Sequence, residues 1–287
     1  MKFEEASAAT MLLTSRRRFL AGAAALAAPS PVRIIDTHTH FYDPSRPQGV
    51  PWPSPTDKLL YRTVLPPEFK KMVQPLGVVG TVVVEASPWV EDNQWILDLA
   101  AKDPFLLGLV GNLQPGQPEF GAQLARFAKN PKFVGIRVNA GALRKGLESA
   151  GFLEDLRRLK DSDRELDVVG GGSLLADTAA LAAKLPDLRI VIDHLPFDSA
   201  PDLNELAGAN NVYAKISNVL RKGGSWSREA VDHVWTVFGE RRVIYGSNWP
   251  VSDRVAPYAD VLRVVQEYCA SKSAEARDNY FWRNALS

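Results

Sequence analysis

The sequence predicts an α/β fold with a single (β/α)8 barrel, a TIM barrel, and three observations carry this prediction. Short apolar runs alternate with longer segments whose apolar residues recur every three or four positions, as strands and helices do. The length of 287 residues suits one such barrel, and no low-complexity linker divides residues 32–287. A doubly wound sheet would be expected to carry a glycine-rich turn after its first strand. This chain has THTHFYD there instead.

The apolar runs are rich in Val and Ile, as expected for parallel strands that are buried on both faces. In chain order they are residues 33–40, 81–87, 106–113, 133–139, 166–172, 189–195, 211–217 and 242–248. Helical spacing is clearest in PPEFKKMVQPLGV, NQWILDLAAKD, EFGAQLARFAKN, GFLEDLRRLKD, LLADTAALAAKL and REAVDHVWTVFG. Pro67 and Pro201 are placed as first-turn prolines of two helices.

The connection from residue 41 to residue 64 is longer than the others and is rich in proline. Long connections in compact domains are usually functional or disordered. Connections that follow strands line the active-site mouth of a barrel. We therefore expect residues 41–64, which include Trp52, to form a lid or a specificity loop.

The N-terminal region is predicted to be an export signal and linker, residues 1–31, followed by the barrel domain, residues 32–287. A basic cluster at Arg16–Arg18 precedes an apolar segment and then small residues, and Ser15–Leu20 resembles the twin-arginine export motif. The apolar segment is too short to span a bilayer as a helix. We expect export to the periplasm, with translation from Met1 or from Met11, and a cytoplasmic protein if the signal is not used.

Charge and cysteine content exclude several classes of function. Lys and Arg total 34 and Asp and Glu total 33, which gives a net charge of +1, and neither sign forms a block that would bind nucleic acid. The single cysteine, Cys269, excludes an internal disulfide and a thiolate metal cluster, and its helical setting predicts a core thiol. The expected partner is a small-molecule substrate, with no nucleic acid and no membrane contact beyond export.

Histidines stand where two of the predicted strands end. Side chains two residues apart share a face of a strand, so Asp36, His38 and His40 are predicted to point together into the barrel at its C-terminal mouth. Two imidazoles at this spacing can share one zinc ion. His194 ends the sixth strand and is a third candidate ligand. If it points inward, Asp193 points outward among the helices and is structural.

Three further charged residues also stand at strand ends: Glu85 on the second strand, Arg137 on the fourth and Lys215 on the seventh. Each of them alone is equally consistent with a polar plug inside the barrel. Their common position at strand C-termini favours a function, because charges buried inside a barrel must be paired or functional.

The segments DTHTH, GIRVN, VIDHLP and VIYGSNWPV resemble the amidohydrolase superfamily, and most of all its amidohydrolase-related branch. That branch includes hydrolases of sugar lactones and dicarboxylate lactones. The resemblance runs from about Ile34 to Asn284. It implies a (β/α)8 barrel, hydrolysis of a lactone or a similar carbonyl, and at most one divalent metal, with zinc as the first expectation.

The resemblance also implies roles for individual residues. His38, His40 and His194 fall on the first-strand and sixth-strand histidines of the family. Arg137 and Lys215 fall on positions that bind a substrate carboxylate or hydroxyl. A metal-free mechanism stays open, with His194 or Arg137 polarising the carbonyl while a carboxylate activates water.

The chain departs from the family pattern on two strands. Gly170–Gly172 end the fifth strand, where binuclear relatives place another histidine, so a two-metal centre is not expected. Asn248 stands where the family has an aspartate on the eighth strand. In relatives that aspartate is the general base and sometimes a metal ligand, whereas a neutral amide cannot accept the proton and is a poor zinc ligand. Glu85 is the first expected substitute, followed by Asp36 and Asp253.

The leading hypothesis is therefore a hydrolase of a small cyclic ester, either a sugar lactone or a dicarboxylate lactone. Trp249 is expected to wall the substrate pocket, although a buried aromatic residue is equally consistent. Two alternatives stay open. One is a metal-dependent decarboxylase of the same superfamily, and the other is a catalytically silent barrel that binds a ligand and has lost its base at Asn248.

Overall fold

The computed structural model describes residues 33–197 and 202–287. The export signal predicted for residues 1–31 lies outside the described residues. Within those residues, no helix has the length and apolar character needed to cross a bilayer.

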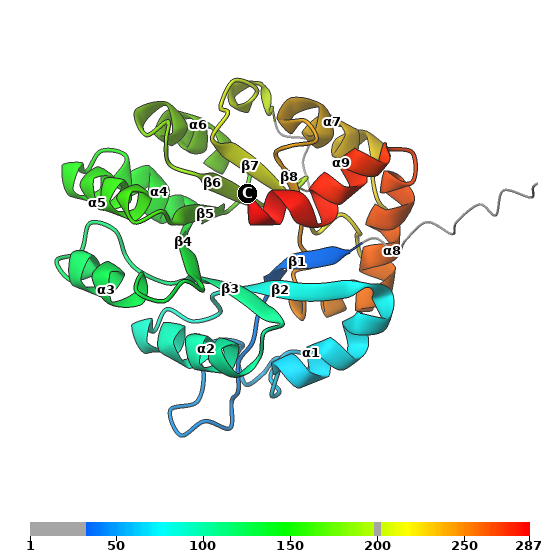
Figure 1. Cartoon of the computed structure of the whole chain (residues 1–287), viewed down its shortest axis with the longest axis horizontal. Helices are drawn as coiled ribbons and strands as arrows, with labels where there is room; N and C mark the ends of the chain where they lie inside the picture. Colours follow the sequence, from blue (N-terminus) through cyan, green and yellow to red (C-terminus); the bar gives the residue numbers. More distant parts are fainter. Residues whose placement is uncertain (1–32, 198–201) are drawn as a thin grey trace, which may run out of the picture. The chain divides into compact units, whose positions relative to one another are not determined.

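Eight parallel strands form one sheet in the order of the chain, which confirms the predicted barrel (Figure 1). After β8 the chain closes the sheet onto β1, because Asn248 N donates to His38 O and His40 N donates to Trp249 O, both at 2.9 Å. The strands are β1 (Ile34–Thr39), β2 (Val78–Val84), β3 (Leu106–Gly111), β4 (Phe133–Asn139), β5 (Glu165–Val169), β6 (Ile190–Leu195), β7 (Val212–Ile216) and β8 (Val243–Tyr245).

Helices surround the strands on the outside (Figure 1). The first of them has proline in its first turn, as predicted for Pro67. The helices are α1 (Pro66–Val73), α2 (Val90–Lys102), α3 (Phe120–Phe127), α4 (Ala140–Gly146), α5 (Ala150–Asp161), α6 (Leu174–Lys184), α7 (Arg228–Phe238), α8 (Tyr258–Cys269) and α9 (Ala274–Asp278). Shorter helical turns are η1 (Gln74–Leu76), η2 (Asn204–Leu206), η3 (Val251–Arg254), η4 (Asn279–Arg283) and η5 (Asn284–Leu286).

The connection from β6 to β7 differs from the prediction. The helix expected after Pro201 is replaced, within residues 202–211, by the single 3-10 turn η2, and Pro201 itself lies outside the described residues. Leu203 and Leu206 of this region are fully buried in the hydrophobic core. The turn η2 contacts α6 and α7, and the two leucines contribute to the core in place of the expected amphipathic helix.

Alternation along the strands separates the side chains that pack against the helices from those that face the inside of the barrel. In β6, Ile190 and Ile192 belong to the core between sheet and helices, whereas Val191 lines a cavity inside the barrel. That inner cavity, about 320 Å³ in volume, is lined at its other side by residues 284–287. The C-terminal segment therefore covers the N-terminal end of the barrel, where Figure 1 shows the chain end over the strands. The opposite, C-terminal mouth is therefore the end that is open to a substrate. Catalytic residues of such barrels lie at that end.

Candidate active site

A cavity of about 840 Å³ opens at the C-terminal mouth of the barrel. Its lining includes His40 after β1, Glu85 after β2, Arg137 in β4 and Trp52 of the long loop. This volume suits a small organic molecule. The other polar lining is mostly uncharged and consists of Ser87, Asn112, Gln114, Gln117, Asn139 and Ser149, with Lys145 as a further cation.

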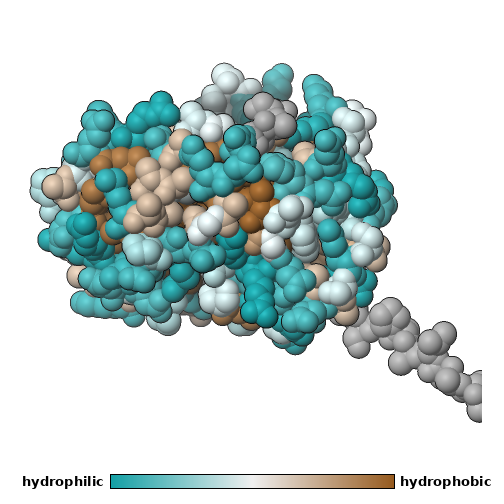
Figure 2. Space-filling view, turned by 90° about the horizontal axis from the view of Figure 1, so that it is seen from above, coloured by the Kyte–Doolittle hydropathy of each residue, from teal (hydrophilic) through white to brown (hydrophobic). Residues whose placement is uncertain are grey.

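The loop of residues 41–64 contributes an aromatic wall to this cavity through Trp52. The indole ring lies 5.9 Å from the His40 ring and 5.3 Å from the Tyr42 ring, measured between centroids, with both contacts edge to face. Earlier in the loop, Arg46 pairs with Asp92 of α2 at 2.6 Å. These contacts hold Trp52 against the cavity, as expected for a specificity loop. Figure 2 shows the side of the molecule, where the surface is mostly hydrophilic with some hydrophobic areas.

Asp36 points away from the cavity, so the prediction that it lies at the barrel mouth is wrong. Its Oδ1 accepts from the backbone N–H groups of His38 at 3.1 Å and Ser247 at 2.9 Å. Its Oδ2 accepts from the hydroxyl of Tyr258 in α8 at 3.1 Å, and burial raises the pKa of Asp36 to about 6. A register shift between Asp36 and Thr39 interrupts the alternation of β1, so Asp36 faces the helices while His38 faces the interior.

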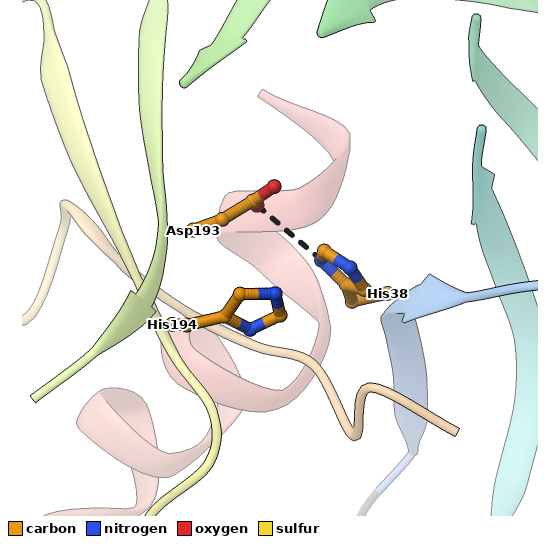
Figure 3. A group of neighbouring side chains, drawn as sticks. All are labelled: His38, Asp193 and His194. Carbon is orange, nitrogen blue, oxygen red and sulfur yellow. Dashed lines mark ion pairs between the residues drawn. The ribbon is translucent and has the colours of Figure 1, made fainter. Parts of the chain in front are cut away.

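His38, Asp193 and His194 form a buried cluster in which each offers one ligand atom within 4.8 Å of the others (Figure 3). Asp193 Oδ1 lies 3.3 Å from His38 Nδ1, and the rings of His38 and His194 are 4.4 Å apart. The expectation that Asp193 points outward is therefore wrong. His194 has a φ of +68°, and this left-handed residue breaks the alternation of β6, so that two consecutive side chains reach the same site.

The three histidines of the site are neutral at ordinary pH. Burial lowers the pKa of His38 well below its usual value, that of His40 to about 3 and that of His194 to about 4. His194 Nδ1 lies 2.8 Å from Ser217 Oγ, and His40 Nδ1 lies 2.9 Å from the Val84 carbonyl oxygen. Neutral imidazoles with one nitrogen fixed by a neighbour are the form that binds metals.

A chain of buried ion pairs runs below the cavity. Lys215 Nζ lies 2.8 Å from Asp167 Oδ2 and 2.9 Å from Asp193 Oδ1. Asp193 Oδ2 lies 3.6 Å from Arg137 Nη1, and Arg137 donates to Glu85 Oε1 from Nε at 2.9 Å and from Nη2 at 2.8 Å. These ion pairs link Glu85 and Arg137 of the cavity lining to the cluster of His38, Asp193 and His194.

Lys215 is not exposed to substrate, which contradicts the role predicted for it. Its side chain is 2% exposed, and it is absent from the lining of the mouth cavity. Burial alone would lower the pKa of Lys215, but Asp167 and Asp193 together raise it above its usual value. Lys215 therefore stays charged and holds the two carboxylates together.

Glu85 and Arg137 lie where the sequence predicted them, at the cavity wall. Their side chains are 21% and 13% exposed. Burial raises the pKa of Glu85, while the charge of Arg137 and its hydrogen bonds lower it. Asp253, the other substitute considered for the base, lies 3.8 Å from Arg62 of the long loop and does not line the cavity.

The two residues after Ser247 have different surroundings. Asn248 Oδ1 lies 3.3 Å from His40 Nε2, and Asn248 Nδ2 donates to Asn218 Oδ1 at 3.1 Å. Trp249 is 1% exposed and packs 4.9 Å from the Phe69 ring, outside the cavity lining, so the prediction that it walls the pocket is wrong. Its apolar ring completes the core between sheet and helices.

The buried cluster fits one divalent cation. His38 Nε2 is buried without a hydrogen-bond partner among the described residues, and its Nδ1 lies 3.3 Å from Asp193 Oδ1 without a well-formed hydrogen bond. The oxygens of Asp193 have ion pairs with Lys215 and Arg137 but no well-formed hydrogen bond there. Such atoms are destabilising unless a partner satisfies them. Imidazole nitrogen and carboxylate oxygen are the ligands that zinc and similar cations take. His40, the other metal ligand predicted, lies outside this group of three.

Several residues of the site escaped the sequence reasoning. Asp167 is an aspartate within an apolar strand, and that was the available signal for a buried ion pair. Ser217 and Asn218 follow β7 and contact His194 and Asn248, and nothing in the sequence around them marks these contacts.

Comparisons with known proteins show the family of this chain. The profile of the amidohydrolase family matches residues 35–287. The L-fucono-1,5-lactonase of Burkholderia ambifaria is 30% identical over 246 residues, which cover 79% of this chain and 83% of that protein. The L-fucono-1,5-lactonase of Burkholderia multivorans is 24% identical, and the match covers 86% of this chain and 92% of that protein.

A solved structure has the same fold. It is an amidohydrolase from Burkholderia multivorans with bound zinc, which superposes with a TM-score of 0.79 at 22% identity. The match covers 88% of this chain and 98% of that one. The family profile spans nearly all the described residues, and the fold and the histidine cluster fit it. This chain belongs to the amidohydrolase family.

Proposed function

We propose that this enzyme hydrolyses the ester bond of a small lactone, and that a sugar lactone is its substrate. The cavity at the barrel mouth, in which His40, Glu85 and Arg137 meet, carries this proposal. The lactonases among the relatives support it.

The polar lining favours a sugar lactone over a dicarboxylate lactone. The charge of Arg137 is already matched by Glu85 at 2.8 Å and by Asp193 at 3.6 Å. Most of the other polar lining residues are amides and hydroxyls, which hydrogen-bond to sugar hydroxyl groups. Trp52 adds an apolar face against which a sugar ring can pack.

His38, Asp193 and His194 would hold a divalent cation, for which zinc is our first choice. When bound, the cation supplies Lewis acidity toward the lactone carbonyl. Arg137 fixes one oxygen of Glu85 through two hydrogen bonds, which orients the carboxylate at the cavity wall. Glu85 takes a proton from the attacking water, and the oxygen of that water adds to the carbonyl carbon of the lactone. The ring C–O bond then breaks, and the proton passes from Glu85 to the departing alkoxide.

Acid release from a panel of sugar and dicarboxylate lactones tests this function. Each lactone is incubated with the purified enzyme after treatment with a chelator and again after addition of zinc. We expect turnover of sugar lactones that falls at least 100-fold with chelator and returns with zinc, because the Lewis acid supplies several kcal/mol of transition-state stabilisation. Dicarboxylate lactones should be poorer substrates.

Two results would contradict the proposal. If no lactone of the panel is turned over with zinc present, the proposal of lactone hydrolysis is wrong. Release of carbon dioxide from aromatic acids would then indicate the decarboxylase. Turnover that resists the chelator would overturn the metal-dependent part alone. In that case Glu85, Arg137 and His194 would have to carry the reaction.

We further propose that residues 1–31 direct export through the twin-arginine route to the periplasm. The basic cluster followed by an apolar segment supports this proposal. Replacing Arg16 and Arg17 together with lysine keeps the charge and should abolish appearance of the enzyme in a periplasmic fraction. Export that is unaffected by the double substitution would contradict the route, while the matched variant Arg33→Lys serves as the control.

A further inference from the structure

The mouth cavity extends beyond the residues to which the proposed reaction gives a role. His40, Glu85 and Arg137 line its reacting end. A second region, which we call the outer part, is lined by the connection that follows β3 and by α4 and α5. Its lining includes Gln114, Gly116, Gln117, Ala142, Lys145 and Phe152. The proposed hydrolysis uses no residue of the outer part.

The volume of the cavity exceeds the volume that one sugar ring needs. A six-carbon sugar lactone has about a dozen non-hydrogen atoms. At roughly 30 Å³ for each of them, the share of a water molecule in the liquid, it would take up no more than about 360 Å³. The cavity has a volume of about 840 Å³. A lactone joined to a second sugar would take up about 700 Å³ on the same scale, so it fits.

Packing sets the shape of the outer part. The backbone N–H of Gly116 donates to Asp155 Oδ2 at 2.7 Å, which fastens the connection after β3 to α5. Gly116 has a φ of +87°, a conformation that glycine adopts without strain. A side chain at Gly146 would overlap the ring of Phe152, so only glycine lets α4 lie this close to α5. Phe152 thereby gives the outer part an apolar floor.

The polar side chains of the outer part are not used by the fold. Gln114 and Gln117 are exposed, and their amides make no hydrogen bond within residues 33–197 and 202–287. Lys145 has no ion pair within the same ranges. By contrast, Asn112 donates to the Pro88 carbonyl oxygen at 2.6 Å and so supports the wall itself. Amides that both donate and accept match the hydroxyl groups of a sugar.

We propose that the substrate is a disaccharide lactone, in which the lactone ring carries a second sugar residue and that residue occupies the outer part. The inference rests on the proposed function, because the lactone group has to lie at Glu85. The second ring then packs against Phe152, and its hydroxyl groups bind Gln114 and Gln117. A hydrocarbon substituent would displace water from these amides without replacing its hydrogen bonds, which costs binding free energy.

Initial rates of acid release above the uncatalysed rate test this inference. The purified enzyme with zinc is given disaccharide lactones such as cellobionolactone, single-ring sugar lactones such as gluconolactone, and a lactone with a long alkyl chain. We expect the best disaccharide lactone to have a kcat/KM at least about tenfold above that of the best single-ring lactone, because it alone contacts the outer part. The alkyl lactone should be a poorer substrate than either.

Two variants show whether the outer part carries this preference. Ala142→Trp places an indole in the outer part and should lower kcat/KM for the disaccharide lactone about 100-fold, because the reacting ring is displaced. The double variant Gln114→Ala with Gln117→Ala should lower it about tenfold. Both should leave kcat/KM for the single-ring lactone within about threefold of wild type. Ala122→Trp is the matched control, since Ala122 is an exposed residue of α3 outside the cavity lining, and should change neither value.

The possible failures of the inference and of the proposed function differ. A single-ring or alkyl lactone whose kcat/KM equals or exceeds that of every disaccharide lactone would overturn the inference and leave lactone hydrolysis standing. Equal losses for both kinds of sugar lactone in Ala142→Trp would overturn it as well. An enzyme that turns over no lactone of any kind would instead refute the proposed function, and this inference with it.

Discussion

Replacing Lys215 with methionine is expected to lower the free energy of unfolding by about 3–5 kcal/mol, the usual cost of removing one partner of a buried ion pair. The ammonium group lies within 2.9 Å of carboxylates of both Asp167 and Asp193, and its side chain is 2% exposed. Without it, Asp167 loses its cation in a place that water does not reach. Urea unfolding followed by circular dichroism measures the change, and thermal unfolding should show a fall of about 10 °C.

Two comparisons separate this structural role from the substrate role first predicted for Lys215. The double variant Lys215→Met with Asp167→Asn should recover part of the lost stability, because the uncompensated carboxylate is gone. Lys160→Met removes a lysine whose partner, Asp161, is on the surface, and should leave unfolding unchanged. Wild-type stability of Lys215→Met combined with a raised KM would show that Lys215 binds substrate instead.

The barrel was predictable from the sequence because its signals are local. Val- and Ile-rich runs alternate with segments of helical spacing, and this pattern follows from burial of strands on both faces. The ends of the strands also placed His40, Glu85 and Arg137 correctly at one mouth, since strand C-termini of such a barrel meet there, whereas His38 is buried beside His40. The helix expected after Pro201 was wrong, because the short turn η2 with the buried Leu203 and Leu206 packs against α6 and α7 in its place.

The orientation of single side chains was not predictable, because it depends on local breaks in the strands. Asp36 shares the outer face of Ile34, and the register shift that follows Asp36 in β1 turns His38 inward. Asp193 shares the inner face of Val191, and the left-handed backbone of His194 brings His194 to the same site. The position of Lys215 along the barrel axis could not be predicted either. Strands of a barrel are staggered, so a position near the end of one strand does not fix its height relative to the others. The position of Lys215 at a strand end had suggested that it reaches the mouth cavity. Instead it lies below that cavity, beside Asp167.

Replacing Glu85 with glutamine is expected to lower kcat about 100- to 10,000-fold, the usual contribution of a general base. Glutamine has the same shape, and its oxygen still accepts the two hydrogen bonds from Arg137 that Glu85 Oε1 accepts at 2.9 Å and 2.8 Å. What the substitution removes is the ability to take a proton from water. The KM for the lactone should change little, because the amides and Trp52 that line the cavity are untouched.

Glu91→Gln is the matched control for this substitution, because Glu91, an exposed residue of α2, pairs with Arg126 of α3 and does not line the cavity. It should keep wild-type kcat. Zinc content and thermal unfolding of Glu85→Gln should equal those of the wild type, which would exclude a loss of metal or of fold as the cause. A kcat within about fivefold of wild type would rule out Glu85 as the base. No carboxylate would then be left among the described residues that line the cavity, so the proton would have to pass to a neutral group such as the His40 imidazole.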